Sequence, residues 1–318
     1  MYLGIEIGGT KLQVGIGAGD GQLAGIWRES VDVAAGPEGI RKQLTRAFPE
    51  LLERTGIQRS AVAGVGIGFG GPVDDSRHRI IKSHQIEGWD DFPLADWVAE
   101  VLGCPAILGN DADVAGLAEA LFGAGKGLSP IFYITLGSGI GGGLVIDGQM
   151  YRGHGRGAAE IGHLRMPVVS GGEMRWLPLE QLTSGWAIGR QAQAAMAAGW
   201  DAPRRLPDTP VTAEWVARLA EQGDRQALAI LHDAWSHLAD AICHVIALLC
   251  PRRIVIGGGV SLMGERILFE PLRALVAERV FRPFAGYYDI VPAALGEEVV
   301  VQGALGLARL RFEDLSRA

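Results

Sequence analysis

The sequence predicts an α/β fold made of two lobes. Two stretches far apart in the chain, Ile5–Leu23 and Ile134–Met150, share one order: an apolar strand, a turn of Gly, Ser or Thr, a second strand, and Asp-Gly-Gln. We interpret them as a divergent internal repeat. Between and after them, β-branched runs alternate with segments of helical periodicity, and 318 residues leave room for two domains.

The first stretch predicts a strand over Leu3–Ile7, a break at Gly8-Gly9-Thr10-Lys11 and a return strand over Leu12–Ile16. A third strand is expected within Leu23–Val33. In the second stretch, strands over Ile131–Leu136 and Leu144–Ile146 flank Gly137-Ser138-Gly139. Glycine turns between two strands direct several backbone N–H groups at one point, so each turn is a candidate phosphate site.

The next segments predict a helix over Gly39–Thr55, a buried strand over Ala61–Phe69 and a helix over Asp91–Leu102. The strand contains a formal GxGxxG in Gly66, Gly68 and Gly71. Pro72 follows and no helix begins there, so a dinucleotide site is rejected, and close packing is expected at Gly66 and Gly68. Gly70-Gly71 is expected to form a floor for a flat ligand.

A strand over Ala106–Leu108 leads into Asn110-Asp111-Ala112-Asp113 and then a helix. Asn and Asp are preferred N-caps, so these residues can serve the helix alone, with Asp113 available for capping. The alternative is that Asp111 is catalytic. Further along, Glu160 and His163 share a face on a helical turn, where they can form a core pair or bind a ligand.

The remaining chain predicts helices, strands and a surface loop at Trp200–Pro210. The expected helices are 186–199, 213–222, 224–249, 262–280 and 298–310, and the expected strands are 253–256 and 289–293. Gly257-Gly258-Gly259 follows the strand over 253–256. These glycines can form a tight turn between strand and helix, or a surface on which a planar ligand lies.

Composition limits the function classes. The net charge of −7 argues against a nucleic-acid partner, and no apolar run is long enough for a membrane helix. The three cysteines lack CxxC spacing. Cys243 and Cys250 lie in an apolar helical stretch and are expected to be buried thiols, which indicates a reducing cytoplasm.

In five motifs the chain resembles the ROK sugar kinases of the actin-like ATPase superfamily. The motifs occur in the family's order, and they are Gly4–Lys11, Asn110–Ala112, Gly137–Gly143, Glu160–His163 and Ile256–Gly259. The resemblance implies a two-lobed actin-like ATPase (ribonuclease H-like) fold with a cleft between the lobes. The expected lobes are residues 1–118 plus 300–318 and residues 119–299, with the last helix packed on the first lobe. A homodimer is also implied.

The resemblance implies ATP- and Mg²⁺-dependent phosphorylation of a hexose, with glucose as the first expectation. Asp111 would be the general base. The sugar-binding residues would be Gly71, Gln85, Asn110, Asp111, Glu160, His163 and Glu180. Gln85 stands where the family often has Asn, and the family's cysteine-rich zinc loop after His163 has no cysteine here, so no structural zinc is expected.

The nucleotide would be bound by the three glycine turns. Its phosphates would lie on Gly8, Gly9, Thr10, Lys11, Gly137, Ser138 and Gly139, and its adenosine on Gly257, Gly258 and Gly259. Glu6, where much of the family has Asp, would bind Mg²⁺ through water.

Several alternatives stay open. The hexose could be fructose, mannose or an N-acetylhexosamine, and Asn110–Glu119 also resembles polyphosphate glucokinases. The family includes sugar-sensing repressors, but the first strand is expected at Tyr2, which leaves no room for a helix-turn-helix. A scaffold or filament role would leave Glu160 and His163 unexplained.

Overall fold

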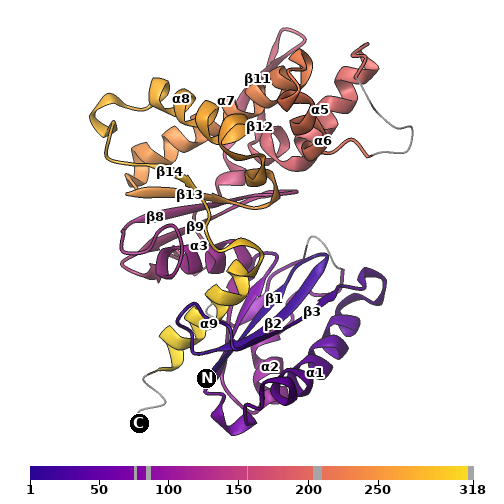
Figure 1. The fold of residues 1–318 in the computed structure, drawn as a ribbon, viewed down its shortest axis with the longest axis vertical. Coiled ribbons are helices and arrows are strands. Elements are labelled where there is room, and N and C mark those ends of the chain that lie inside the picture. The colour runs from indigo at the N-terminus through magenta and orange to yellow at the C-terminus, as the bar shows by residue number, and fades with distance from the viewer. Residues whose placement is uncertain (75–76, 84–86, 156, 203–209, 314–318) are drawn as a thin grey trace. The chain divides into compact units, whose positions relative to one another are not determined.

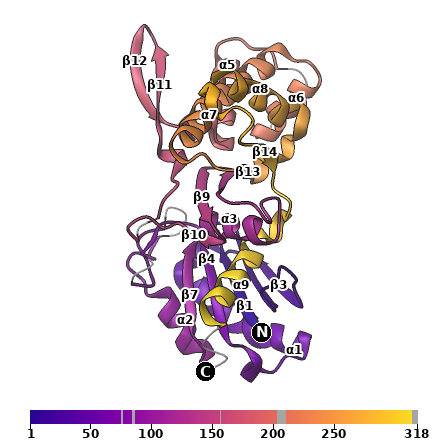
Figure 2. The same cartoon turned by 90° about the vertical axis from the view of Figure 1, so that its left-hand side faces the viewer.

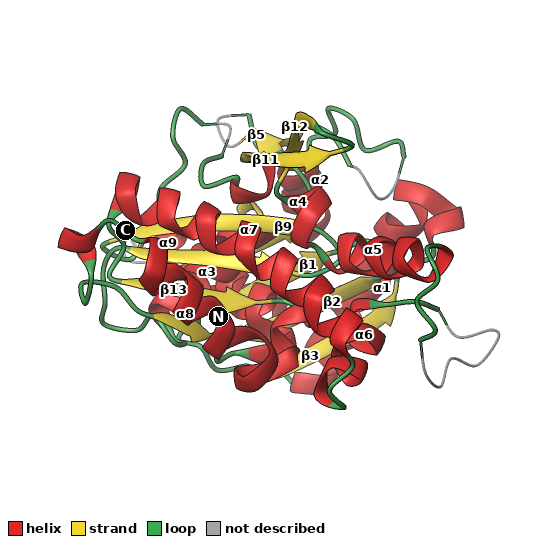
Figure 3. Ribbon diagram, turned by 90° about the horizontal axis from the view of Figure 1, so that it is seen from above, coloured by secondary structure: helices red, strands yellow, loops and turns green. Residues whose placement is uncertain are grey.

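The protein is a mixed α/β structure in which helices and strands both make up a large part of the chain (Figures 1 and 3). The computed structural model describes residues 1–74, 77–83, 87–155, 157–202 and 210–313. The predicted α/β class is confirmed. Two compact units occur, one made of 1–129, 143–158 and 294–318 and the other of 130–142 and 159–293. The predicted lobe boundaries stay a prediction.

The first unit contains a five-stranded sheet in the order β3-β2-β1-β4-β7. β1 pairs antiparallel with β2 and parallel with β4, and β4 pairs parallel with β7. The strands are β1 Tyr2–Ile7, β2 Lys11–Gly17, β3 Gly25–Ser30, β4 Gly64–Phe69 and β7 Ala106–Asn110. A small separate ladder pairs β5 Val73–Asp74 with β6 Arg79–Ile80.

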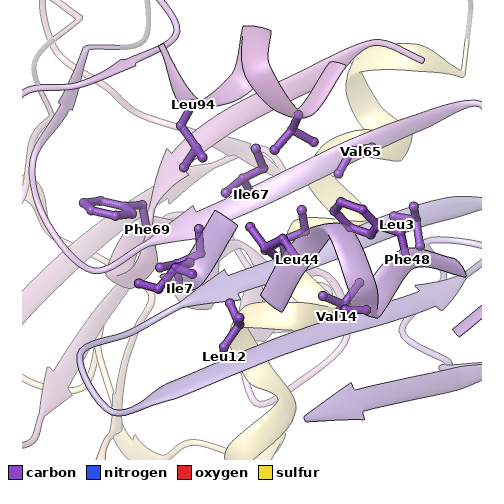
Figure 4. Packing of buried hydrophobic residues seen from close by; sticks show 14 of the residues in the cluster. Leu3, Ile7, Leu12, Val14, Leu44, Phe48, Val65, Ile67, Phe69 and Leu94 are labelled. Carbon is purple, nitrogen blue, oxygen red and sulfur yellow. The ribbon is translucent and has the colours of Figure 1, made fainter. Parts of the chain in front are cut away.

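One face of this sheet packs against α1 (Gly36–Thr55) and α2 (Leu94–Leu102). Because side chains alternate along a strand, Leu3, Ile5 and Ile7 all point to this face. They meet Leu44 and Phe48 of α1 and Leu94 of α2 in one buried cluster (Figure 4). The helix predicted over Gly39–Thr55 is therefore confirmed, and it begins three residues earlier.

The opposite face of the sheet receives α9 (Val299–Phe312) at very close range. Gly15, Gly4 and Gly66 lie side by side in register on β2, β1 and β4. A methyl group added at Gly66 would lie 1.9 Å from the carbonyl oxygen of Ala304. The expectations of close packing at Gly66 and of a last helix on the N-terminal part are confirmed (Figure 1).

The second sheet repeats this order as β10-β9-β8-β13-β14. β8 and β13 are parallel, as are β13 and β14. In both sheets the first strand of a glycine-turn hairpin is central, with two later strands on its other side, as an internal repeat predicts. The strands are β8 Ile131–Leu136, β9 Ile140–Ile146, β10 Gln149–Met150, β13 Arg253–Gly257 and β14 Ile290–Pro292.

The helices of the second unit are α4 Glu180–Thr183, α5 Gly185–Ala197, α6 Ala213–Glu221, α7 Arg225–Leu249 and α8 Glu270–Arg279. Helices α5, α6 and α7 begin within one residue of their predicted starts, whereas α4 was not predicted. The helix predicted over 262–280 is interrupted, because Gly264 has a φ of 76° and a π-helical turn over Glu265–Phe269 precedes α8. Part of the predicted loop at 200–210 lies outside the described residues.

The expectation of two buried cysteines is wrong. Cys250 is exposed, because it is the left-handed residue that ends α7, and Cys243 is only partly buried. Among the described residues, each helix is too short or too polar to span a bilayer.

A two-stranded hairpin that the sequence did not predict follows His163. β11 (Arg165–Ser170) pairs antiparallel with β12 (Glu173–Pro178), and the turn is Gly171-Gly172. In Figure 2 it projects from the helices of the second unit. Val169, Met174 and Trp176 share one face of it and are more than half exposed.

Candidate active site

The carboxyl ends of three parallel strands meet at one edge of the first sheet. Ile7, Phe69 and Asn110 are the last residues of β1, β4 and β7, and they are neighbours in register. The segments that follow these residues therefore start side by side, at the edge where α/β proteins commonly bind ligands. They are the first glycine turn, Gly70-Gly71 and Asp111.

Backbone hydrogen bonds hold the first glycine turn in place. The N–H of Gly8 donates to Lys11 O over 3.0 Å, and the N–H of Val31 donates to Thr10 O over 3.0 Å. The N–H of Gly70 donates to Ile7 O over 2.9 Å, so the chain after β4 lies against this turn. The predicted phosphate-binding residues thus form a fixed hairpin turn.

Asp111 is the first residue of α3 (Asp111–Leu121) and lies beside Gly70. A methyl group at Gly70 would lie 3.4 Å from Asp111 Oδ2 and 3.6 Å from Gly8 Cα. Asp111 Oδ1 accepts from the N–H of Ala112 over 2.8 Å. The structure therefore places the predicted base and the first glycine turn on either side of one glycine.

The N-cap of α3 is Asn110, and the alternative that Asp113 caps the helix is wrong. Asn110 Oδ1 accepts from the N–H groups of Ala112 and Asp113, and its Nδ2 donates to Gly71 O over 3.0 Å. Asp113 is buried and pairs with Arg152 at 3.5 Å. Asn110 therefore performs the capping that the sequence offered to either an Asn or an Asp.

Glu6 lies one step before the turn and is only 9 % exposed. Its register partner on β2 is Gln13, whose Nε2 donates to Glu6 Oε2 over 2.6 Å. The ammonium of Lys11 lies 3.3 Å from Glu6 Oε1 and also donates to Glu297 O. Burial raises the pKa of Glu6 above its ordinary value, and the charge of Lys11 opposes that rise. Lys11 thus does not project freely into solvent.

Gln13 and Arg28 extend this network, and the sequence interpretation missed both. Gln13 is fully buried, and its Oε1 accepts from Arg28 Nε over 2.7 Å. Arg28 also pairs with Glu298, just before α9. A polar Gln in an otherwise apolar strand, opposite Glu6, was the signal that could have identified it.

In the second unit, two further glycine turns follow neighbouring parallel strands. Gly137-Ser138-Gly139 follows β8 and Gly257-Gly258-Gly259 follows β13, with Gly257 opposite Thr135. Gly258 has a φ of 86°, and a methyl group there would lie 2.6 Å from Leu136 O. Only glycine permits both this conformation and this approach. The structure thus brings two of the predicted nucleotide-binding turns together.

A pocket of about 850 Å³ opens beside these two turns. Gly137, Ser138 and Gly259 line it, and so do side chains that the sequence interpretation did not identify. Those include Trp186, Arg190, Thr212, Arg218 and Leu262. Trp186 is 68 % exposed, so its ring offers a flat apolar surface to a ligand.

Glu160 and His163 lie on a tight turn that packs against β9. His163 N–H donates to Glu160 O over 3.1 Å, and both residues are exposed. A methyl group at Gly162 would lie 2.2 Å from Ile140 O. Glu180 also reaches Ile140, since its Oε2 accepts from the Ile140 N–H over 2.8 Å. The turn that carries Glu160 and His163 and the carboxylate of Glu180 thus both lie against Ile140, the first residue of β9.

The remaining predicted residues are placed as follows. Gly71 and Asn110 lie with Asp111 in the first unit, and Gln85 lies outside the described residues. Within the described ranges, no group of three or more His, Cys, Asp or Glu side chains is positioned to hold a metal ion.

Comparison with known proteins identifies the family. Residues 2–311 match the model of the ROK family. The chain belongs to the ROK family. It is 31 % identical to the glucokinase of Thermotoga maritima over 98 % of each chain, and 30 % identical to the N-acetylmannosamine kinase of Escherichia coli over 96 % of this chain and 98 % of that one.

The fold comparison agrees with this membership of the ROK family. A ROK family glucokinase from Streptomyces griseus, solved in complex with glucose and AMPPNP, superposes with a TM-score of 0.80 at 30 % identity. The match covers 97 % of this chain and 99 % of that chain. The predicted actin-like ATPase fold is therefore confirmed.

Proposed function

We propose that this chain is an ATP- and Mg²⁺-dependent hexose kinase that converts glucose to glucose 6-phosphate, with Asp111 as general base. That it is a sugar kinase rests on its ROK membership and its glucokinase relatives. The observation in the structure that carries the proposal is the edge where β1, β4 and β7 end. There Gly70 lies between the carboxylate of Asp111 and the first glycine turn.

Phosphoryl transfer depends mainly on positioning and charge neutralisation. A sugar hydroxyl oxygen forms a bond to the γ-phosphorus, and the bond from that phosphorus to the bridging β–γ oxygen breaks. Asp111 accepts the hydroxyl proton, so the products are a hexose phosphate and ADP. A positioned base of this kind contributes about 10²–10⁴ in rate.

We propose that the phosphates bind to the backbone N–H groups of the two hairpin turns. Gly8, Gly9 and Thr10 provide one set of backbone donors, and Gly137, Ser138 and Gly139 provide the other. Lys11 supplies a positive charge next to the first set. The adenosine fits the pocket beside Gly259, where Trp186 offers a surface for stacking.

The residues around Glu6 fit a magnesium ion held through water. The charge of a buried carboxylate is stabilised by a nearby cation, and Lys11 already contributes in this way, 3.3 Å from Glu6 Oε1. Mg²⁺ commonly keeps several waters and uses one or two carboxylates plus substrate phosphates, so a single Glu suffices. When bound, the ion neutralises charge on the phosphates.

The hexose would be bound through Gly71, Asn110, Glu160, His163 and Glu180, with Gln85 as a further contact. Hydroxyl groups paired with such side chains give strong selectivity, because an analogue that lacks one leaves a polar group unpaired. A second candidate substrate is an N-acetylated hexosamine, since an N-acetylmannosamine kinase is 30 % identical to this chain.

A coupled ADP-release assay over a panel of hexoses tests the proposal. Glucose, mannose, fructose and N-acetylmannosamine are compared with ATP and Mg²⁺, and hexose phosphate formation is then measured with polyphosphate as donor. We expect glucose with ATP to give the highest kcat/KM. Turnover of N-acetylmannosamine alone would favour the second candidate, and no turnover of any hexose with either donor would exclude a sugar kinase.

The family resemblance implies a homodimer and a cytoplasmic location. Light scattering on the purified chain measures the oligomeric state directly. A mass of twice 33.7 kDa is the expected result.

A further inference from the structure

The carboxylate of Glu180 is bonded to the second glycine turn, 40 residues away in sequence. Its Oε2 accepts from the N–H of Ile140, the residue that follows the turn, over 2.8 Å. A methyl group at Gly139 would lie 2.5 Å from the same oxygen. Glycine at position 139 therefore lets this carboxylate approach the backbone of the turn, and a larger residue there would displace it.

A second bond ties the same short segment to the beginning of the turn. After α4, the N–H of Gly185 donates to Gly137 O over 2.8 Å. Ser184 is buried and caps α5 by accepting from the N–H of Ala187. The segment from Glu180 to Gly185 thus holds both ends of the turn, through a side chain at one end and a backbone bond at the other.

The turn so held is part of the pocket wall. Gly137, Ser138, Gly185 and Trp186 all line the pocket beside Gly259. Hydrogen bonds that involve an ionised group are shorter and stronger than neutral ones, so the carboxylate of Glu180 fixes the exit of the turn firmly. Glu180 Oε1 makes no hydrogen bond within the described part of the chain and is available to a hydroxyl group.

We propose that Glu180 is a positioning residue for the nucleotide-binding turn and that hexose binding is transmitted to the nucleotide through it. This inference rests on the proposed function. A hexose hydroxyl that binds Oε1 would immobilise the carboxylate. Because Oε2 accepts from the Ile140 N–H, the backbone of the adjacent turn, Gly137–Gly139, would then also become less mobile. Because coupling between two binding equilibria is reciprocal, nucleotide would also tighten hexose binding by the same factor.

Binding measurements without turnover test this role. Titration calorimetry gives the Kd of Mg·AMPPNP with and without a saturating hexose, for wild type, Glu180→Ala, Glu180→Gln and Gln181→Ala. Gln181 is the exposed neighbour on α4 and serves as the matched control. A residue that only contacted sugar would leave the Kd measured without hexose unchanged.

We expect wild type to bind AMPPNP about fivefold or more tightly when hexose is present, a coupling in the usual range. Glu180→Ala should weaken AMPPNP binding several-fold without hexose and abolish most of the coupling. Glu180→Gln keeps an oxygen for the Ile140 N–H, so its Kd without hexose should return to near wild type. Gln181→Ala should match wild type in both conditions.

Two further measurements guard against a variant that is simply misfolded. Gly139→Ala pushes the carboxylate away without removing it, so it should reproduce the weaker AMPPNP binding of Glu180→Ala. Hydrogen exchange of the Ile140 amide should be faster in Glu180→Ala than in wild type and slowed again in Glu180→Gln. Thermal unfolding checks that each variant folds.

The outcomes separate this inference from the proposed function. A wild type that phosphorylates no hexose and binds no AMPPNP overturns both. A wild type that phosphorylates a hexose, together with unchanged AMPPNP affinity and coupling in Glu180→Ala, overturns the inference alone.

Discussion

Asp111 lies at the start of α3, where the backbone N–H groups of the first turn favour a negative charge. Its Oδ1 already accepts from the N–H of Ala112, and this bond orients the carboxylate. Asn110 takes the capping role, so a substitution at Asp111 leaves the helix cap intact. Such a substitution therefore tests the carboxylate while the helix cap is retained.

We predict that Asp111→Asn lowers kcat by about 10²–10⁴ and changes hexose affinity only a few-fold. The amide keeps the shape and the acceptor oxygen but cannot take the proton. Steady-state kinetics and hexose titration measure the two effects. Asp96→Asn makes the same change in the first turn of α2 at an exposed position and should be neutral. Turnover near wild type in Asp111→Asn would remove Asp111 from the role of base.

The three cysteines should differ strongly in reactivity. Cys250 is exposed, whereas burial raises the pKa of the Cys243 thiol to about 11, with the nearby charge of Asp240 as a second cause. Only the thiolate is a nucleophile, so at about pH 8 roughly one Cys243 thiol in a thousand is reactive. Burial also raises the pKa of Cys104.

We therefore predict that a thiol reagent such as DTNB modifies Cys250 first and Cys243 last at about pH 8. Peptide mapping by mass spectrometry identifies the order, and Cys250→Ser should lose the fast phase. Because the pKa of Cys243 is raised, its rate of labelling should increase as the pH rises toward about 11. Modification of Cys243 as fast as that of Cys250 would contradict the burial that raises this pKa.

Residue types and spacing predicted which side chains to consider, but not their partners. Glu6, Asp111 and Glu180 were identified from the sequence, while Gln13 beside Glu6 and Ile140 beside Glu180 were not. The first pairing depends on strand register and the second on a contact across 40 residues. The isolated Gln in an apolar strand was a signal for the first pairing, whereas the second has no local signal.

At the scale of elements, a row of glycines determines how close α9 comes to the first sheet. Gly15, Gly4 and Gly66 stand in register. The backbone of α9 occupies the space that side chains at Gly4 and Gly66 would fill, and the side chain of Val301 occupies that space at Gly15. Glycine inside a strand weakens it, and a close approach of another backbone is a common reason for its presence. The turn just before the helix supplies Glu297 and Glu298 to the network around Glu6.

We predict that Gly66→Ala destabilises the protein by about 3 kcal/mol, the upper end of the usual cost of overpacking, because its methyl group would overlap the carbonyl oxygen of Ala304 and rigid backbone must move. Urea unfolding followed by circular dichroism measures the loss. Gly137→Ala is the control, since a methyl group there meets no atom within 4 Å. Equal stability of the two variants would show that α9 does not pack on this row in solution.

Helices and strands were predicted correctly where apolar residues recur with one clear period. They were missed where the apolar side chains of an element are exposed rather than buried. The glycine-turn hairpins and α7 follow such patterns. The hairpin β11–β12 has exposed apolar residues and proline, so its alternation is poor, although Gly171-Gly172 between two apolar runs was a usable turn signal.

At the scale of the whole chain, the first unit is completed by the last helix. α9, at residues 299–312, covers β1 and β4, which lie more than 200 residues earlier. Five of its large apolar side chains are buried, namely Val300, Val301, Leu305, Leu307 and Phe312. At roughly 1.5–3 kcal/mol each, their burial contributes about 10 kcal/mol, which is comparable to the whole stability of a typical domain.

We predict that a chain ending at Leu295 does not fold its first unit, whereas a chain ending at Glu313 keeps α9 and melts like wild type. Without α9, the apolar residues and open glycine row on β1 and β4 face water, and the strands lose the helix that holds them. Soluble yield and thermal melting by circular dichroism compare the two truncations with the full chain. A cooperative wild-type transition in the chain that ends at Leu295 would mean that the sheet is stable with one face bare. Because these contacts join the two ends of the chain, we also expect the first unit to complete its folding only after residue 312 has been synthesised.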